Sequence, residues 1–247
     1  MINQSVFAFA NVEDYLAPSE ILLRDKDNPT AFFARAKLTD ADGHPTPVAQ
    51  RALRTLGIVS RIRSSALTAT PAAYQSPPPS PLDNQYFSAA PFLFGPDRAM
   101  KFSAKPLAPV TAGTLDVSDP RYLRTALHQR LTAAGASPVV FTFQVQVRTG
   151  AELADKIDTD IEDATVEWDA AQHPFIDAGM ITIPPQDFET DERRALCESL
   201  TFSPWHGLAE HRPLGGINRL RRPVYDASGR HRLGAKWMGG CPMSGIS

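Results

Sequence analysis

In residues 140–148, Val-Phe-Thr-Phe-Gln-Val-Gln-Val-Arg, apolar and polar side chains alternate strictly from Phe141 onward. Successive side chains of a β-strand point to opposite faces, so this pattern predicts a strand with one apolar face and one polar face. The polar face carries two amides and a guanidinium. Such groups face either water or a cavity that polar side chains line. The chain therefore has to build a sheet around this strand.

Residues 99–105 form a second alternating segment after a Gly-Pro-Asp turn, and they predict a half-buried strand that pairs with residues 86–95. Further strands are expected at residues 5–10, 165–168 and 178–183. Apolar spacing and capping residues predict helices at 11–23, 49–60, 121–131 and 189–200. Antiparallel strands followed by late helices define an α+β fold, in which the sheet is either a barrel or open.

Composition excludes several classes of function. The 247 residues carry a net charge of −2, which argues against a dedicated nucleic-acid binder. No apolar run approaches the length of about 18 residues that a membrane span needs, so no membrane partner is expected. Two distant cysteines, Cys197 and Cys241, offer no disulfide framework and fit a reducing, cytoplasmic compartment.

The arginine-rich segment over residues 212–234 contains the strongest candidate site. Arg221 and Tyr225 are four residues apart, so they share one face of a helix. A guanidinium beside a phenol favours the phenolate, which can ligate ferric haem iron. Arg232 lies two turns after Tyr225 and could pair with a haem propionate. By spacing alone, an ordinary surface pair remains open, as does a non-enzymatic domain whose arginines bind a polyanion.

Pro223 complicates this helix. Inside a helix it would remove the amide hydrogen bond to Arg219 and kink the axis before Tyr225. If the helix instead began near Arg222, Arg221 would lie on the cap rather than one turn below Tyr225. Both possibilities are open at this point.

Several blocks of the chain together resemble the catalase family, in particular its shorter catalase-like haem proteins. The blocks are residues 86–95 with Lys101, 161–168, 181–186, 200–206, 211–218 and 221–234. The resemblance implies an antiparallel β-barrel of catalase type with flanking and C-terminal helices. It implies one haem domain over residues 1–235 and a C-terminal tail over residues 236–247. It also implies haem b as cofactor, a peroxide substrate and a homo-oligomer.

The resemblance assigns roles to individual residues. Tyr225 matches the proximal iron ligand, Arg221 the arginine that keeps it ionised, and Arg232 an arginine that pairs with a propionate. Asn3, in the opening Asn-x-x-Val-Phe segment, matches the distal asparagine. The implied function is decomposition of hydrogen peroxide by a tyrosinate-ligated ferric haem.

One departure from the family bears on this function. The family's distal histidine precedes the asparagine, whereas this chain begins after that point and has no histidine before His44. Without that base, O–O cleavage would lose roughly two to four orders of magnitude. We therefore expect a truncated chain, a partner that supplies the missing segment, or impaired activity. An enzyme that processes organic or lipid hydroperoxides is the alternative.

Overall fold

The computed structural model describes residues 6–7, 9–23, 41–42, 44, 80–108, 118–150 and 161–234. The predicted helix at residues 49–60, the tail at 236–247 and Asn3 lie outside these ranges. The predicted strand at residues 5–10 is wrong for its described residues, which have an irregular backbone. This segment is nevertheless fixed, because the Phe7 amide donates to Ala164 O and the Ala164 amide donates to Ala10 O.

The described strands form one antiparallel sheet with the order β1-β3-β4-β5, and β2 also pairs with β3. Their bounds are β1 Tyr86–Phe87, β2 Phe92–Leu93, β3 Arg98–Pro106, β4 Val139–Thr149 and β5 Ile176–Ile183. Three long strands thus arise where alternation predicted them. Among the described residues this sheet is open and does not close into a barrel.

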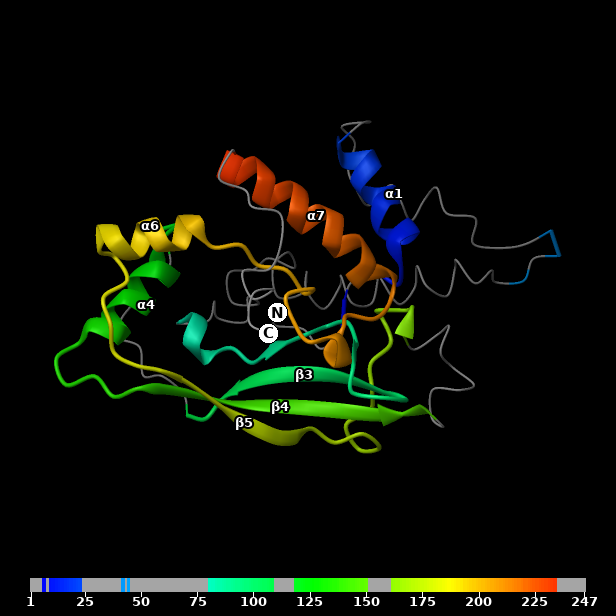
Figure 1. Cartoon of the computed structure of the whole chain (residues 1–247), viewed down its shortest axis with the longest axis horizontal. Coiled ribbons are helices and arrows are strands. Elements are labelled where there is room, and N and C mark those ends of the chain that lie inside the picture. Colours follow the sequence, from blue (N-terminus) through cyan, green and yellow to red (C-terminus); the bar gives the residue numbers. More distant parts are fainter. Residues whose placement is uncertain are drawn as a thin grey trace.

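Helices lie along one side and one end of the sheet (Figure 1). Their bounds are α1 Val12–Leu23, α4 Tyr122–Thr132, α6 Asp191–Ser199 and α7 Gly216–Leu233, with short 3₁₀ turns η1 Pro81–Asp83 and η3 Ala209–His211. As predicted, Asn11 caps α1, because its Oδ1 accepts from the Asp14 amide at 2.9 Å. Thr190, which the sequence did not single out, caps α6. None of the described helices is both long and apolar enough to cross a membrane.

Both faces of the sheet are covered near the middle of β3 and β4, so the prediction that residues 99–105 form a half-buried strand is wrong. Lys101 is only 4% exposed and Gln146 only 2%. Residues 161–173 cover them with an irregular backbone, where a strand at 165–168 was expected. Lys101 Nζ donates to Val166 O at 2.9 Å, and Gln146 Nε2 donates to Trp168 O at 2.8 Å. The polar groups are buried because backbone carbonyls satisfy them.

The opposite face of the sheet is aromatic. Phe92, Met100 and Val145 are buried together, with Phe102 and Phe143 packed against them. The Phe92 and Phe102 rings are 5.0 Å apart between centroids. This aromatic face borders a cavity that α7 lines from the other side, so the sheet and α7 together define the region of the candidate site.

Candidate functional site

The first turn of α7 is fixed by Gly215 and Glu162. Gly215 has a φ of +80°, and a β-carbon there would lie 2.4 Å from Ile161 O, so the close approach of the two segments requires glycine. The Glu162 carboxylate accepts from the Gly216 amide at 2.8 Å and from Arg219 Nη1 and Nη2 at 3.0 and 2.7 Å. Hydrogen bonding from Arg219 lowers the pKa of Glu162, although burial acts in the opposite direction.

Arg221 and Tyr225 lie one turn apart on a single helix. Because α7 begins at Gly216 and continues through Pro223, the alternative start near Arg222 is wrong. Arg221 Nη2 donates to Tyr225 Oη at 3.1 Å, and the guanidinium carbon lies 5.3 Å from the centre of the tyrosine ring. The positive charge of Arg221 therefore lies beside the phenol oxygen of Tyr225.

Asn218, for which the sequence suggested no role, holds the other side of this arginine. Arg221 Nη1 donates to Asn218 Oδ1 at 3.1 Å. The Asn218 side chain is fully buried and donates to Pro91 O and Leu214 O, both at 2.9 Å. The sequence feature that could have identified Asn218 is its position three residues before Arg221, on the same face of the predicted helix.

Two cavities of about 260 and 250 Å³ lie along one face of α7, and Val224 and Tyr225 border both. This face of α7 consists of Ile217, Leu220, Arg221, Val224, Tyr225, Ser228, Gly229 and Arg232. The opposite walls are Phe7, Tyr15, Ser88, Ala89 and Ala90 in the first cavity, and Thr201 and Phe202 in the second. Phe202 is 72% exposed and Val224 53%. An exposed apolar strip beside a few polar groups is typical of a ligand-binding groove.

A third cavity, of about 790 Å³, lies between α7 and the aromatic face of the sheet and also reaches Arg221 and Tyr225. This volume falls within the range of about 300–1,000 Å³ that is usual for cofactor and small-molecule sites. His206 and His211 line it, and the His211 ring stacks on Phe94 with centroids 5.8 Å apart. Tyr225 thus lines all three cavities.

Arg232 borders the 250 Å³ cavity together with Tyr225. Its guanidinium binds the backbone at the C-terminal end of α6: Nη1 donates to Glu198 O at 2.8 Å, and Nη2 donates to Leu200 O. These bonds use two of the five N–H donors of a guanidinium. The structure thus brings Arg221, Tyr225 and Arg232 to one face of α7, whereas Asn3 lies outside the described residues.

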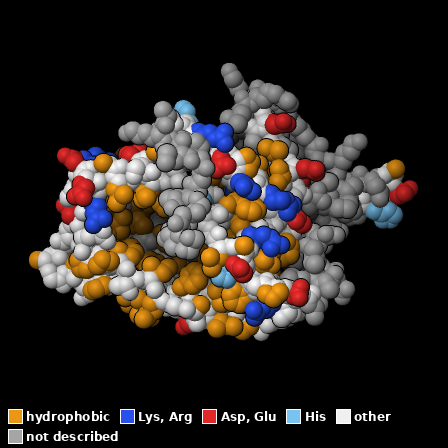
Figure 2. All heavy atoms as spheres, viewed as in Figure 1, with side chains coloured by type: hydrophobic (Ala, Val, Ile, Leu, Met, Phe, Trp, Pro, Cys, Tyr) orange, Lys and Arg blue, Asp and Glu red, His pale blue; other side chains and the backbone are white. Residues whose placement is uncertain are grey.

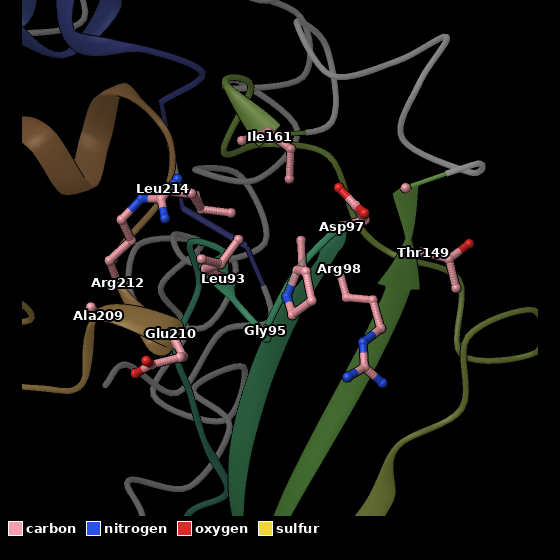
Figure 3. A pocket seen from close by; sticks show the side chains of 13 residues that line it. Leu93, Gly95, Asp97, Arg98, Thr149, Ile161, Ala209, Glu210, Arg212 and Leu214 are labelled. Atoms are coloured by element: carbon pink, nitrogen blue, oxygen red, sulfur yellow. The ribbon is translucent and has the colours of Figure 1, made fainter.

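The largest cavity, about 1080 Å³, lies elsewhere, around the turn between β2 and β3 (Figure 3). Figure 3 shows Glu210 and Arg212 on one wall and Asp97, Arg98 and Thr149 on the other. Its charged groups do not converge on one point. Within the described residues, no group of three or more His, Cys, Asp or Glu side chains could hold a metal ion. We therefore regard the cavities at Tyr225 as the candidate site.

On the face of the molecule seen in Figure 2, apolar side chains surround a hollow, and Lys and Arg side chains gather over the first half of α7. Acidic side chains are interspersed among these basic ones. One of the arginines of α7, Arg219, is ion-paired with Glu162 at 2.7 Å. The coloured part of this face is therefore mixed in charge, unlike the continuous basic patch that a polyanion binder presents.

Comparison with known proteins identifies the class of fold. No family model and no curated protein matches the sequence. Among solved structures, the fold is similar to a fungal catalase (TM-score 0.59, 17% identity), to catalase A from Saccharomyces cerevisiae (0.63, 15%) and to a bacterial catalase (0.55, 14%). Each match covers 94% of this chain but only 44%, 45% and 43% of the respective catalase.

The fold described above, which combines helices with an antiparallel sheet, is therefore catalase-like. The chain spans less than half the length of these catalases.

Proposed function

We propose that this chain is a haem-binding protein of catalase type, in which the Tyr225 phenolate ligates the iron of haem b. The hydrogen bond of 3.1 Å from Arg221 to the oxygen of Tyr225, a residue that lines three cavities, carries the proposal. A cation in this position stabilises the anionic oxygen that a ferric ion requires. The proposed haem domain covers residues 1–235, and residues 236–247 form a tail.

The residues around Tyr225 fit the chemistry of a porphyrin. Tyr225 lines the cavity of about 790 Å³, whose opposite wall carries Phe92, Phe102 and Phe143. The face of α7 that carries Tyr225 is also apolar at Ile217, Leu220 and Val224. Such walls bury an aromatic macrocycle and exclude water. At the other end of this face, Arg232 keeps N–H donors beyond those that bind Glu198 O and Leu200 O, and we assign them to a propionate.

When bound, haem would supply the redox centre for the decomposition of hydrogen peroxide. The protein's part would be to place the Arg221 guanidinium beside the Tyr225 oxygen and to offer a polar donor to the peroxide, for which we propose Asn3. The sequence has no histidine before His44 to act as a distal base. A polypeptide of these 247 residues should therefore decompose hydrogen peroxide slowly, roughly two to four orders of magnitude below a protein with such a base.

The experiment is a titration of the purified chain with haemin, followed by visible spectroscopy. We expect uptake with the spectrum of a ferric tyrosinate haem, which Tyr225→Phe abolishes and Arg221→Met weakens. Tyr122→Phe on α4 makes the same chemical change away from the site and should leave the spectrum unchanged. Hydrogen peroxide and organic hydroperoxides should be assayed in parallel.

An identical spectrum in the Tyr225→Phe variant would contradict the proposed ligand. Failure of the folded chain to take up haemin would contradict haem binding altogether. Salt-sensitive binding of nucleic acid without haem uptake would favour the polyanion-binding alternative instead.

A further inference from the structure

We propose that Asn218 is the positioning residue that aims the Arg221 guanidinium at the phenol of Tyr225. The inference deepens the proposed function, on which its spectroscopic readout rests. Its geometric basis is the set of contacts that Asn218 makes. Asn218 has 0% exposure and lies three residues before Arg221, on the same face of α7.

The hydrogen-bond network determines which way the Asn218 amide faces. Pro91 O and Leu214 O lie 2.9 Å from Nδ2, and carbonyl oxygens can only accept. The amide NH₂ group must therefore face these two carbonyls, which leaves Oδ1 as an acceptor directed at Arg221. Arg221 Nη1, 3.1 Å away, is the donor that meets it. Each atom of the buried amide thus has a fixed partner.

These contacts fix the plane of the guanidinium. Arg221 Nη1 is bound to Asn218, and Nη2 is bound to the Tyr225 oxygen. Because a guanidinium is planar and rigid, holding one nitrogen restricts where the others can point. Without Asn218, the long arginine side chain could turn toward solvent and leave the phenol without its cation.

Asn218 also connects Arg221 to the sheet. Pro91, which is fully buried between β1 and β2, accepts from Asn218 Nδ2 and from the Leu214 amide at 3.0 Å. On the other side, Trp205 Nε1 donates to the backbone oxygen of Asn218 at 3.2 Å. The guanidinium is therefore placed relative to the strands as well as to its own helix.

The test compares Asn218→Leu, which is close in size but cannot hydrogen-bond, with Leu131→Ala, which damages a core remote from α7. In the haem-free full chain, ¹⁵N relaxation of the Arg221 Nε–H group should show an ordered side chain in the wild type. It should become mobile in Asn218→Leu and stay ordered in Leu131→Ala. This readout does not depend on haem, so it separates a failure of the inference from a failure of the proposed function.

With haemin, Asn218→Leu should weaken binding by about tenfold, as expected for loss of a hydrogen bond to a charged group. In an Arg221→Met background, Asn218→Leu should have no further effect, because the two residues act as one unit. An Arg221 group that stays ordered in Asn218→Leu, or fully additive effects on haemin binding, would overturn the inference.

Discussion

Replacing Glu162 by glutamine tests whether one carboxylate fixes the start of the helix that carries Tyr225. Glu162 Oε2 accepts from the Gly216 amide and from Arg219 Nη2, and Oε1 accepts from Arg219 Nη1. Glutamine has the same shape but lacks the charge, and its NH₂ group would face a donor. The substitution therefore removes the electrostatic part of the anchor and little of the packing.

The expected loss of stability follows from the solvent exposure of the two side chains in the ion pair. The Glu162 side chain is 37% exposed and that of Arg219 60%, so solvent screens the ion pair, which should contribute about 0.5–1 kcal/mol. The charge of Glu162 at the N-terminus of α7 adds about 0.3–1 kcal/mol. We expect Glu162→Gln to lower the free energy of unfolding by about 1–2 kcal/mol at pH 7 and low salt.

The difference in unfolding free energy between wild type and Glu162→Gln should decrease as the pH falls. The pKa of Glu162 in the folded protein is lowered from its ordinary value of 4.5, first by the hydrogen bond from Arg219. A lowered folded-state pKa stabilises the protein fully above the unfolded-state pKa, and this stabilisation is lost as the pH falls through the folded-state pKa. The difference between wild type and Glu162→Gln should therefore be constant near neutral pH and shrink below about pH 4.5.

Urea unfolding of both proteins at several pH values between 7 and 3 gives this difference directly. Glu210→Gln, the same change at an exposed glutamate of η3, serves as the control and should alter stability by less than about 0.5 kcal/mol. A difference for Glu162→Gln that does not change with pH would refute the electrostatic reasoning. A difference no larger than that of the control would refute the anchor itself.

Three further substitutions, with Gly135→Ala as the control for the first, test other parts of the fold. Gly215→Ala should cost about 3 kcal/mol or more in urea unfolding, because it combines a φ of +80° with a backbone overlap; Gly135→Ala, with a φ of +71° in open space, should cost only about 1 kcal/mol. Leu131→Ala should cost about 2–5 kcal/mol in the same assay, because this side chain is 4% exposed in a packed cluster. Arg124→Gln should raise the pKa of Glu189 from about 2 toward 4.5 in an NMR titration, because the Arg124 hydrogen bond is the main cause of that lowered pKa; an unchanged pKa would contradict this.

The elements that the sequence predicted well are those whose cause is local. Residues 140–148 form β4 because alternation gives a strand one apolar face, and Asn11 begins α1 because its side chain bonds an amide three residues later. Lys101 and Gln146 show where local reasoning fails. Their alternation is compatible with a strand face exposed to solvent, but residues 161–173 cover both side chains. Because that segment is irregular, it has no hydrophobic periodicity from which its position over the sheet could be predicted.

In the candidate site, too, some contacts follow from sequence spacing and others depend on the tertiary fold. Arg221 and Tyr225 are one helical turn apart, so their contact follows from sequence spacing once a helix is assumed, and it survives Pro223 because α7 begins earlier, at Gly216. Asn218 differs because its partner Pro91 is 127 residues away in sequence. Only the fold brings that carbonyl to the amide. The spacing of an arginine and a tyrosine can therefore suggest a ligand pair, whereas the residue that holds the arginine in place depends on how α7 packs on the sheet.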